Sequence, residues 1–185
     1  GAAGTDFIDG GGGNDAITGG AGVDFLTGNA GADTFVYLEG VAVGAVATIA
    51  QVTAANGADT ITDFANGAGA DVLSVSALLR TAGGAAAAEA FVAQNDGAAV
   101  AASNVVVLTD AQAATLNAAG VDALTANNSN ATGSGVIVFD NNGTVEVWYD
   151  EVMGTDGAGA EVVLIGTLSG TDLADLGNLT AANFI

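Results

Sequence analysis

A strict nine-residue period at the start of the chain is the feature that most limits how it can fold. Residues 1–36 divide without a gap into GAAGTDFID, GGGGNDAIT, GGAGVDFLT and GNAGADTFV. Every repeat has glycine at positions one and four, aspartate at position six and an apolar residue at position eight. In that order these are Gly1, Gly10, Gly19 and Gly28; Gly4, Gly13, Gly22 and Gly31; Asp6, Asp15, Asp24 and Asp33; and Ile8, Ile17, Leu26 and Phe35. Such a period indicates a solenoid of stacked units.

The residue types within the repeat predict a coil. Glycine allows the positive-φ turn that brings carbonyl oxygens inward, and the three residues after each aspartate make a minimal strand with one inward apolar side chain. Two repeats would complete one coil, so that alternate repeats stack on the same edge. Stacked strands lie about 4.8 Å apart, which leaves an ion midway between two turns roughly 2.4 Å from each. That distance lies within the calcium–oxygen range of about 2.3–2.6 Å and is long for magnesium.

The charge balance also favours a bound cation. One Lys or Arg stands against 21 Asp and Glu, for a net charge of −20, which argues against nucleic acid and anionic lipid as partners. The chain has no Cys and no His, which removes zinc–thiolate sites and most acid–base catalysis. The remaining carboxylates and carbonyls are ligands of hard cations such as calcium. Because self-repulsion opposes compaction, we expect folding to depend on a multivalent metal.

These four nonapeptides resemble the repeats-in-toxin (RTX) family, whose motif is G-G-x-G-x-D-x-U-x. The resemblance implies a calcium-binding β-roll with at least two ions. Asp6 and Asp24 would share one ion on one edge, and Asp15 and Asp33 another on the opposite edge. Carbonyls of the glycine turns would complete each shell. A glycine-rich linker without metal is the alternative, and it does not explain an aspartate at every ninth residue.

A second acidic phrase, GADTITDFANGAGADVLSVSALL, starts at Gly57. Alternation over Thr60–Asp63 predicts a strand, and the phrase resembles the segment that closes the roll in the same family. Asp59, Asp63 and Asp71 are therefore second candidates for calcium ligands. Ordinary turn and cap carboxylates are an equally good explanation of all three.

The remainder of the chain is expected to be a scaffold rich in strands. Between Ala82 and Ala126 the pattern predicts an Ala-rich helix, a buried strand over Asn104–Leu108 and a helix starting near Asp110. Strands follow at Gly135–Asp140, Thr144–Asp150 and Glu161–Leu168, which an Asn-Asn-Gly turn and a loop would join into an antiparallel sheet. Its expected core residues are Val136, Val138, Val145, Val147, Trp148 and Ile165. Asp140, Asp150 and Asp156 flank turns, where aspartate is common without any ion.

The predicted fold class is mainly β, with a short parallel β-roll followed by a strand-rich C-terminal domain that holds a few short helices. We divide the chain into a roll at 1–37, a closing segment at 38–80 and a C-terminal domain at 81–185. The uncharged stretch Gly40–Ala58 is interrupted by Thr, Gln and Asn, which argues against a membrane span. No basic region followed by an apolar run opens the sequence, so an export signal is expected elsewhere.

The last residues, AEVVLIGTLSGTDLADLGNLTAANFI, resemble the C-terminal targeting region of proteins exported by type I secretion. The resemblance implies a module of a secreted or cell-surface protein of a Gram-negative-type bacterium, with calcium and the type I secretion apparatus as partners. The composition, rich in Ala, Gly, Val and Thr, leans toward a surface-layer (S-layer), adhesin or fibre protein, and the open coil at Gly1 offers a route to self-association.

The chain itself is expected to be no enzyme, because it has neither an HExxH nor a G-x-S-x-G motif. The alternative is that it forms the tail of an exported hydrolase whose catalytic domain is not in this sequence. A passive acidic ion buffer is a further alternative, and it predicts weak binding without a folding transition.

Overall fold

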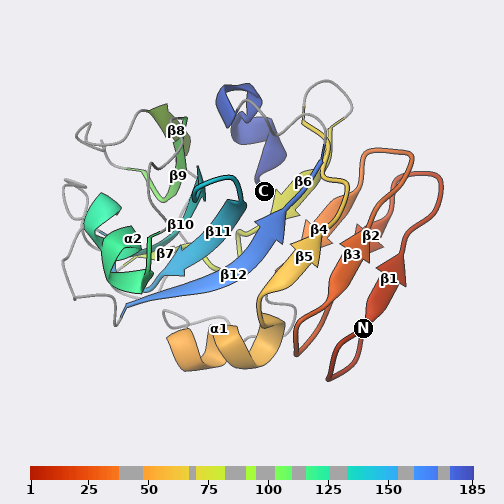
Figure 1. Cartoon of the computed structure of the whole chain (residues 1–185), viewed down its shortest axis with the longest axis horizontal. Helices are drawn as coiled ribbons and strands as arrows, with labels where there is room; N and C mark the ends of the chain where they lie inside the picture. Colours follow the sequence, from red (N-terminus) through yellow and green to blue (C-terminus); the bar gives the residue numbers. More distant parts are fainter. Residues whose placement is uncertain are drawn as a thin grey trace.

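The computed structural model describes residues 1–37, 48–66, 70–81, 91–94, 103–109, 116–125, 133–153, 161–170 and 176–185. The described parts are mainly β, as predicted, with short parallel strands that lead into a larger sheet (Figure 1). No helix in these ranges has the length and apolar character needed to cross a membrane.

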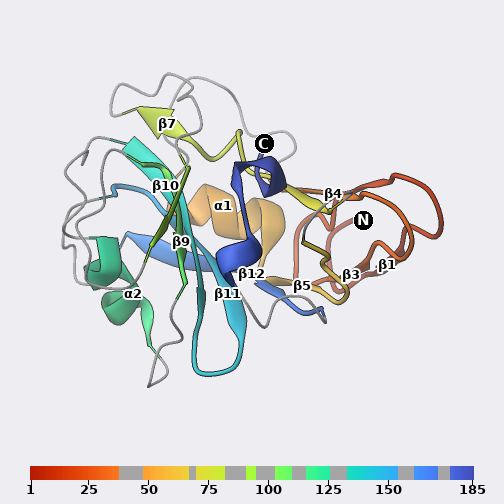
Figure 2. The same cartoon turned by 90° about the horizontal axis from the view of Figure 1, so that it is seen from above.

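Each nonapeptide supplies one short strand. The four strands are β1 (Phe7–Asp9), β2 (Ala16–Ile17), β3 (Phe25–Thr27) and β4 (Thr34–Val36). β1 pairs in parallel with β3 on one face of the coil, and β2 pairs in parallel with β4 on the other. Two repeats therefore make one coil, and three of the four apolar residues at position eight, Ile17, Leu26 and Phe35, are buried inside it. Figure 2 shows the coils from above.

A third coil closes the roll. It consists of β5 (Asp59–Ile61) and β6 (Val72–Ser74), which pair in parallel with β3 and β4 respectively. Helix α1 (Ile49–Asn56) precedes this coil along the chain and begins with a capping box, in which the Thr48 side chain accepts from the Gln51 amide and the Gln51 side chain accepts from the Thr48 amide. The apolar pattern of this segment does not predict the helix.

The C-terminal strands form the antiparallel sheet that the sequence predicts. β10 (Gly133–Asp140) pairs with β11 (Val145–Asp150), and β11 pairs with β12 (Val162–Leu168). Asn142 and Gly143, with φ of 56° and 94°, make the tight turn between the first two. The six predicted core residues are all buried.

Three further strands extend this sheet beyond β10. β9 (Val105–Leu108) lies parallel to β10, and β8 (Phe91–Gln94) lies parallel to β9. β7 (Arg80–Thr81) pairs with the start of β10. The predicted buried strand at Asn104–Leu108 is thus confirmed as β9. The start of the helix predicted near Asp110 and most of the Ala-rich segment after Ala82 lie outside the described residues, and the described helix is α2 (Ala118–Thr125).

The roll and the C-terminal sheet are one structure. β12 pairs in parallel with β5, so that a single sheet runs in the order β1-β3-β5-β12-β11-β10-β9-β8, while β2-β4-β6 form a separate sheet. One cluster of buried apolar side chains reaches from Ile17 in the roll to Phe184 near the C-terminus. The 3₁₀ helices η1 (Leu176–Asn178) and η2 (Ala181–Asn183) bring Phe184 to a parallel bridge with Leu73 of β6.

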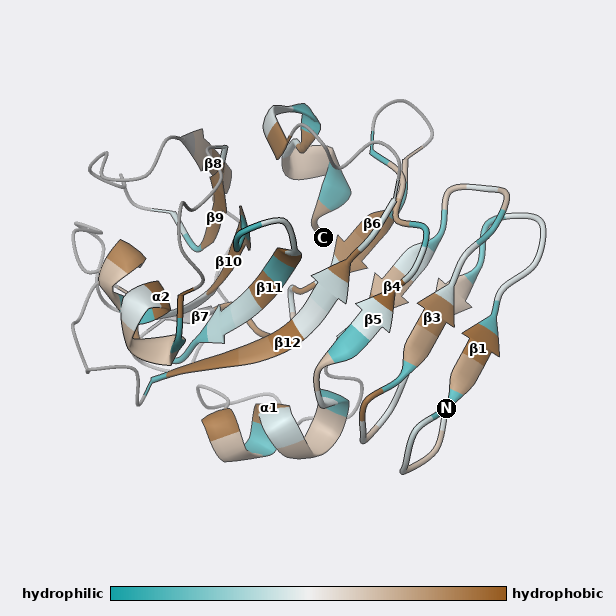
Figure 3. Ribbon diagram, in the orientation of Figure 1, coloured by the Kyte–Doolittle hydropathy of each residue, from teal (hydrophilic) through white to brown (hydrophobic). Residues whose placement is uncertain are grey.

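The outer face of the roll carries an exposed aromatic pair. Phe7 of β1 and Phe25 of β3 are directly paired in register, and their rings stack with centroids 4.9 Å apart. Their exposed fractions are 80% and 37%. Both strands stand out as hydrophobic in Figure 3.

Candidate calcium-binding columns of the roll

Aspartates from successive coils stack into two columns. In the first column, the Asp6 amide donates to Oδ1 of Asp24 at 2.7 Å, and the Asp24 amide donates to Oδ1 of Asp59 at 3.0 Å. The first two residues lie 18 positions apart, whereas Asp24 and Asp59 lie 35 apart. The first column therefore continues in register across the segment that contains α1.

The second column lies on the other edge of the roll. The Asp15 amide donates to Oδ1 of Asp33 at 2.9 Å, and the Asp33 amide donates to Oδ1 of Asp71 at 2.9 Å. The structure thus brings together the two pairs that the RTX resemblance implies and adds one residue of the closing segment to each.

The Oδ2 atoms of three of these carboxylates are the strongest indication that the columns bind a cation. Oδ2 of Asp15, Asp24 and Asp33 is buried without a hydrogen-bond partner, and Asp24 and Asp33 have no exposed surface. An ionised carboxylate buried in this way is costly unless a cation compensates it. The sequence has no Lys, and its one Arg, Arg80, lies in β7 outside the roll. A cation from solution would compensate these carboxylates.

Position-one glycines leave room beside these oxygens. A Cβ built on Gly10 would lie 2.9 Å from Oδ2 of Asp15 and 3.1 Å from the carbonyl oxygen of Gly28 in the next coil. On Gly1 it would meet Oδ2 of Asp6 and the carbonyl oxygen of Gly19, and on Gly28 it would overlap Oδ2 of Asp33. Glycine is therefore required where carboxylate and carbonyl oxygens converge, and this donor set fits calcium.

Position-four glycines shape the turns. Gly4, Gly13, Gly22 and Gly31 all have φ between 114° and 152°, a region that other residues rarely adopt. A Cβ on Gly22 would also overlap the carbonyl of Gly4 in the preceding coil. Across the described parts of the chain, no group of three or more acidic side chains forms a ready metal cluster, so backbone carbonyls would have to supply the remaining ligands.

Burial disfavours the charged form of both column carboxylates of the closing coil. Burial raises the pKa of Asp59 from 3.8 to about 7, an effect that the hydrogen bond from the Asp24 amide opposes and the Asp24 charge reinforces. Burial likewise raises the pKa of Asp71 above its ordinary value. Both shifts indicate that the ionised carboxylates are held in an environment that disfavours negative charge.

Asp63 does not join either column. Its Oδ1 accepts from the Gly28 amide at 2.9 Å and its Oδ2 from the Asn29 amide at 2.7 Å, so both oxygens cap a turn of the preceding coil. Asn14, which was not among the predicted site residues, also links neighbouring coils, because its side-chain oxygen accepts from the Ala32 amide at 3.0 Å. Its place at position five, between a turn glycine and the aspartate, was the available signal.

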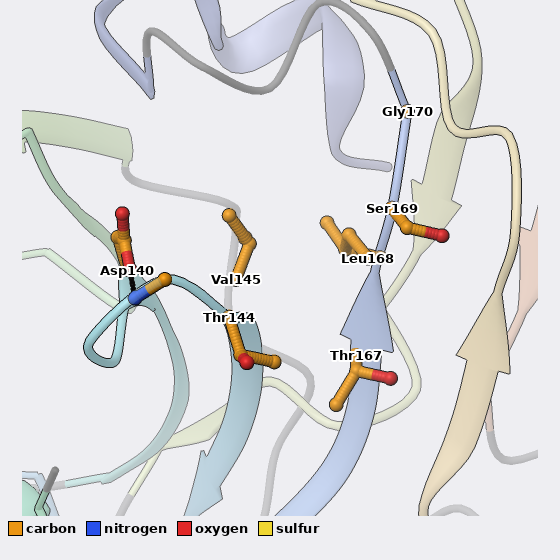
Figure 4. Close-up of a pocket in the computed structure, with 8 residues that line it drawn as sticks. Asp140, Thr144, Val145, Thr167, Leu168, Ser169 and Gly170 are labelled. Carbon is orange, nitrogen blue, oxygen red and sulfur yellow. Dashed lines mark hydrogen bonds between the residues drawn. The ribbon is translucent and has the colours of Figure 1, made fainter.

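The carboxylates near later turns play local roles. Asp140 accepts from the Gly143 amide at 2.5 Å, at the rim of a pocket that Thr144, Thr167 and Ser169 also line (Figure 4). Asp150 is buried and accepts from the Val152 amide, and Asp156 lies outside the described residues.

Comparison with known families agrees with this geometry. Residues 1–35 match the RTX calcium-binding nonapeptide repeat, in four copies. No curated protein matches the chain. The chain therefore carries RTX calcium-binding repeats, and the matched region ends before the third coil.

Proposed function

We propose that the chain is a non-catalytic module of an exported protein whose roll folds when it binds calcium. The observation that carries this proposal is the set of buried, unpartnered Oδ2 oxygens of Asp15, Asp24 and Asp33. They lie in a roll whose repeats belong to a calcium-binding type, in a chain of net charge −20.

Binding and folding would be coupled because the columns form only when the coils stack. Every ligand pair joins residues at least 18 positions apart, so the unfolded chain holds no preformed site. A ligand that binds only the folded state stabilises it by about 2.7 kcal/mol at 100 times its dissociation constant. With affinities on the order of 10⁻⁴–10⁻³ M, typical of extracellular modules, the roll would stay open in a calcium-poor cell and close outside it.

Circular dichroism and the fluorescence of Trp148 test this proposal on the whole chain. In a chelator we expect loss of β signal, and excess calcium should restore it. Magnesium at the same concentration is the control, and it should not restore the signal because the roll favours calcium–oxygen distances. A β signal that is the same in chelator and in calcium would overturn the proposal.

The proposal also covers the export route of the protein and its role outside the cell. We propose type I secretion on the resemblance of the last residues, and a structural or adhesive role at the cell surface on the composition. Removal of residues 161–185 should abolish export by cells that carry a type I apparatus, and export of the shortened chain would contradict that route. Calcium-dependent growth of light scattering would support an S-layer or fibre role, whereas a monomer at every calcium concentration would count against it.

A further inference from the structure

The third coil lacks the glycine that completes the earlier cradles. In each repeat a position-one glycine precedes the aspartate by five residues. The carbonyl oxygen of Gly19 faces Gly1 of the preceding coil, and the carbonyl oxygen of Gly28 faces Gly10. Five residues before Asp59 stands Ala54, which lies within α1. The helix therefore replaces the part of the turn that would have supplied this carbonyl.

A carboxylate oxygen occupies that place instead. A Cβ built on Gly19 would lie 2.6 Å from Oδ2 of Asp24 and 2.7 Å from Oδ2 of Asp59. Asp24 has no exposed surface and its Oδ2 has no hydrogen-bond partner, while Asp59 is 3% exposed and uses Oδ1 for the Asp24 amide. Two buried carboxylate oxygens thus converge on one point, an arrangement that a divalent cation stabilises.

We propose that Asp24 and Asp59 hold one further calcium ion beside Gly19, with Asp59 contributed from outside the matched nonapeptides. This inference rests on the proposed function, since it adds a site to the same roll. The additional site is expected in the first column only, because the carboxylate that ends the second column has other partners. Oδ1 of Asp71 accepts from the Asp33 amide and Oδ2 accepts from the Ala65 amide, each at 2.9 Å, so backbone amides occupy both oxygens. The third coil adds an ion on one edge only.

Counting bound calcium by native mass spectrometry of the whole chain tests this asymmetry. Asp59→Asn should bind one ion fewer than the unaltered chain. The amide that it introduces can donate to Oδ2 of Asp24, so we expect the variant to fold. Asp71→Asn is the matched control, and it should keep the full ion count while its unfolding midpoint falls, because one backbone amide loses its acceptor.

A second pair of variants gives the same answer without removing a carboxylate. Gly19→Ala would place a methyl group against both oxygens and should also remove one ion. Gly12→Ala is its control, because a Cβ there meets nothing within 4 Å and the other three repeats already have alanine at that position. It should leave the count unchanged.

The outcomes separate the two proposals. If the unaltered chain binds no calcium, the proposed function fails. If the chain binds calcium but both Asp59→Asn and Gly19→Ala keep the full count, only the additional site fails. Loss of an ion in Asp71→Asn would overturn the asymmetry between the columns.

Discussion

The side-chain amide of Asn183 donates a hydrogen bond of 3.0 Å to the backbone carbonyl of Asp71, the residue that ends the second aspartate column. The two residues are 112 positions apart and both are buried. Next to them, the Ile185 amide donates to Leu73 of β6, and the Ile185 carbonyl accepts from the amides of Val75 and Ser76. Residues 183–185 therefore cap the separate sheet of the roll.

Loss of this cap should destabilise the roll. Phe184 is 1% exposed and its ring lies 5.7 Å from that of Phe91, so Phe184→Ala should lower the free energy of unfolding by about 3–5 kcal/mol. Urea unfolding in excess calcium measures this loss of stability. The Phe184→Ala variant should also need a higher calcium concentration to fold. Ala182→Ser changes an exposed neighbour and serves as control. An unchanged midpoint in Phe184→Ala would contradict a capping role.

Removal of the Tyr37 hydroxyl should leave the fold as stable or more stable. This hydroxyl is buried without a hydrogen-bond partner, and burial raises the pKa of Tyr37 far above its ordinary value. Because an unsatisfied buried group costs about 1–3 kcal/mol, Tyr37→Phe should raise the free energy of unfolding by about 1 kcal/mol. A loss of stability on urea unfolding would show that the hydroxyl has a partner in solution.

A double-mutant cycle tests whether the Tyr37 hydroxyl lies against Gly166. A Cβ on Gly166 of β12 would overlap the Tyr37 hydroxyl, so Gly166→Ala should be destabilising. The same substitution should cost less in a chain that already carries Tyr37→Phe, because the clashing oxygen is gone. Equal costs in the two backgrounds would mean that the two residues do not meet.

Without calcium, the residual folded population should fall as pH rises. The folded-state pKa of Asp59 is about 7 and its ordinary value is 3.8, so the folded state binds this proton more tightly than the unfolded state. The stabilising contribution is full below about pH 4 and is lost as pH rises through about 7. The residual β signal in chelator, followed by circular dichroism across this range, measures it, and Asp59→Asn should flatten the dependence on pH. With calcium the trend should reverse, because protons compete for the carboxylates. A residual β signal in chelator that grows with pH would contradict the shift.

The two kinds of carboxylate on the roll should behave differently. Asp24 lies in the middle of its column, so Asp24→Asn should raise the calcium concentration needed for folding at least about tenfold. Asp63 only caps the turn at Gly28, so Asp63→Asn should cost about 1 kcal/mol and keep the ion count. A calcium titration followed by circular dichroism compares them, and equal shifts would place Asp63 among the ligands.

The features that sequence predicted well are local ones. The nine-residue period sets the strands of the first two coils, and Asn142 with Gly143 sets the turn between β10 and β11. The place of Asp59 in the first column could not be read from the period, because 35 residues rather than 18 separate it from Asp24. Helix α1 had a readable signal, the capping box formed by Thr48 and Gln51.

The sequence pattern does not predict which distant strands pair with each other. Nothing in the pattern of β5 or β12 specifies that they lie side by side, since the preference of residues for a strand does not specify the partner strand. Their contact depends on how the roll and the C-terminal sheet share one apolar core. Patterns along the chain, from which a boundary at residue 81 is predicted, carry no information about a core shared across it.

The junction between β5 and β12 gives the folding of this chain a direction. Thr60 and Thr167 are register partners 107 positions apart, so the third coil has no neighbour on its inner side until residues close to the C-terminus are available. In a chain released N-terminus first, this coil can pair with β12 only after a further 107 residues have emerged. A chain released C-terminus first presents the edge of β12 as a ready template, on which the coils then add one by one toward Phe7.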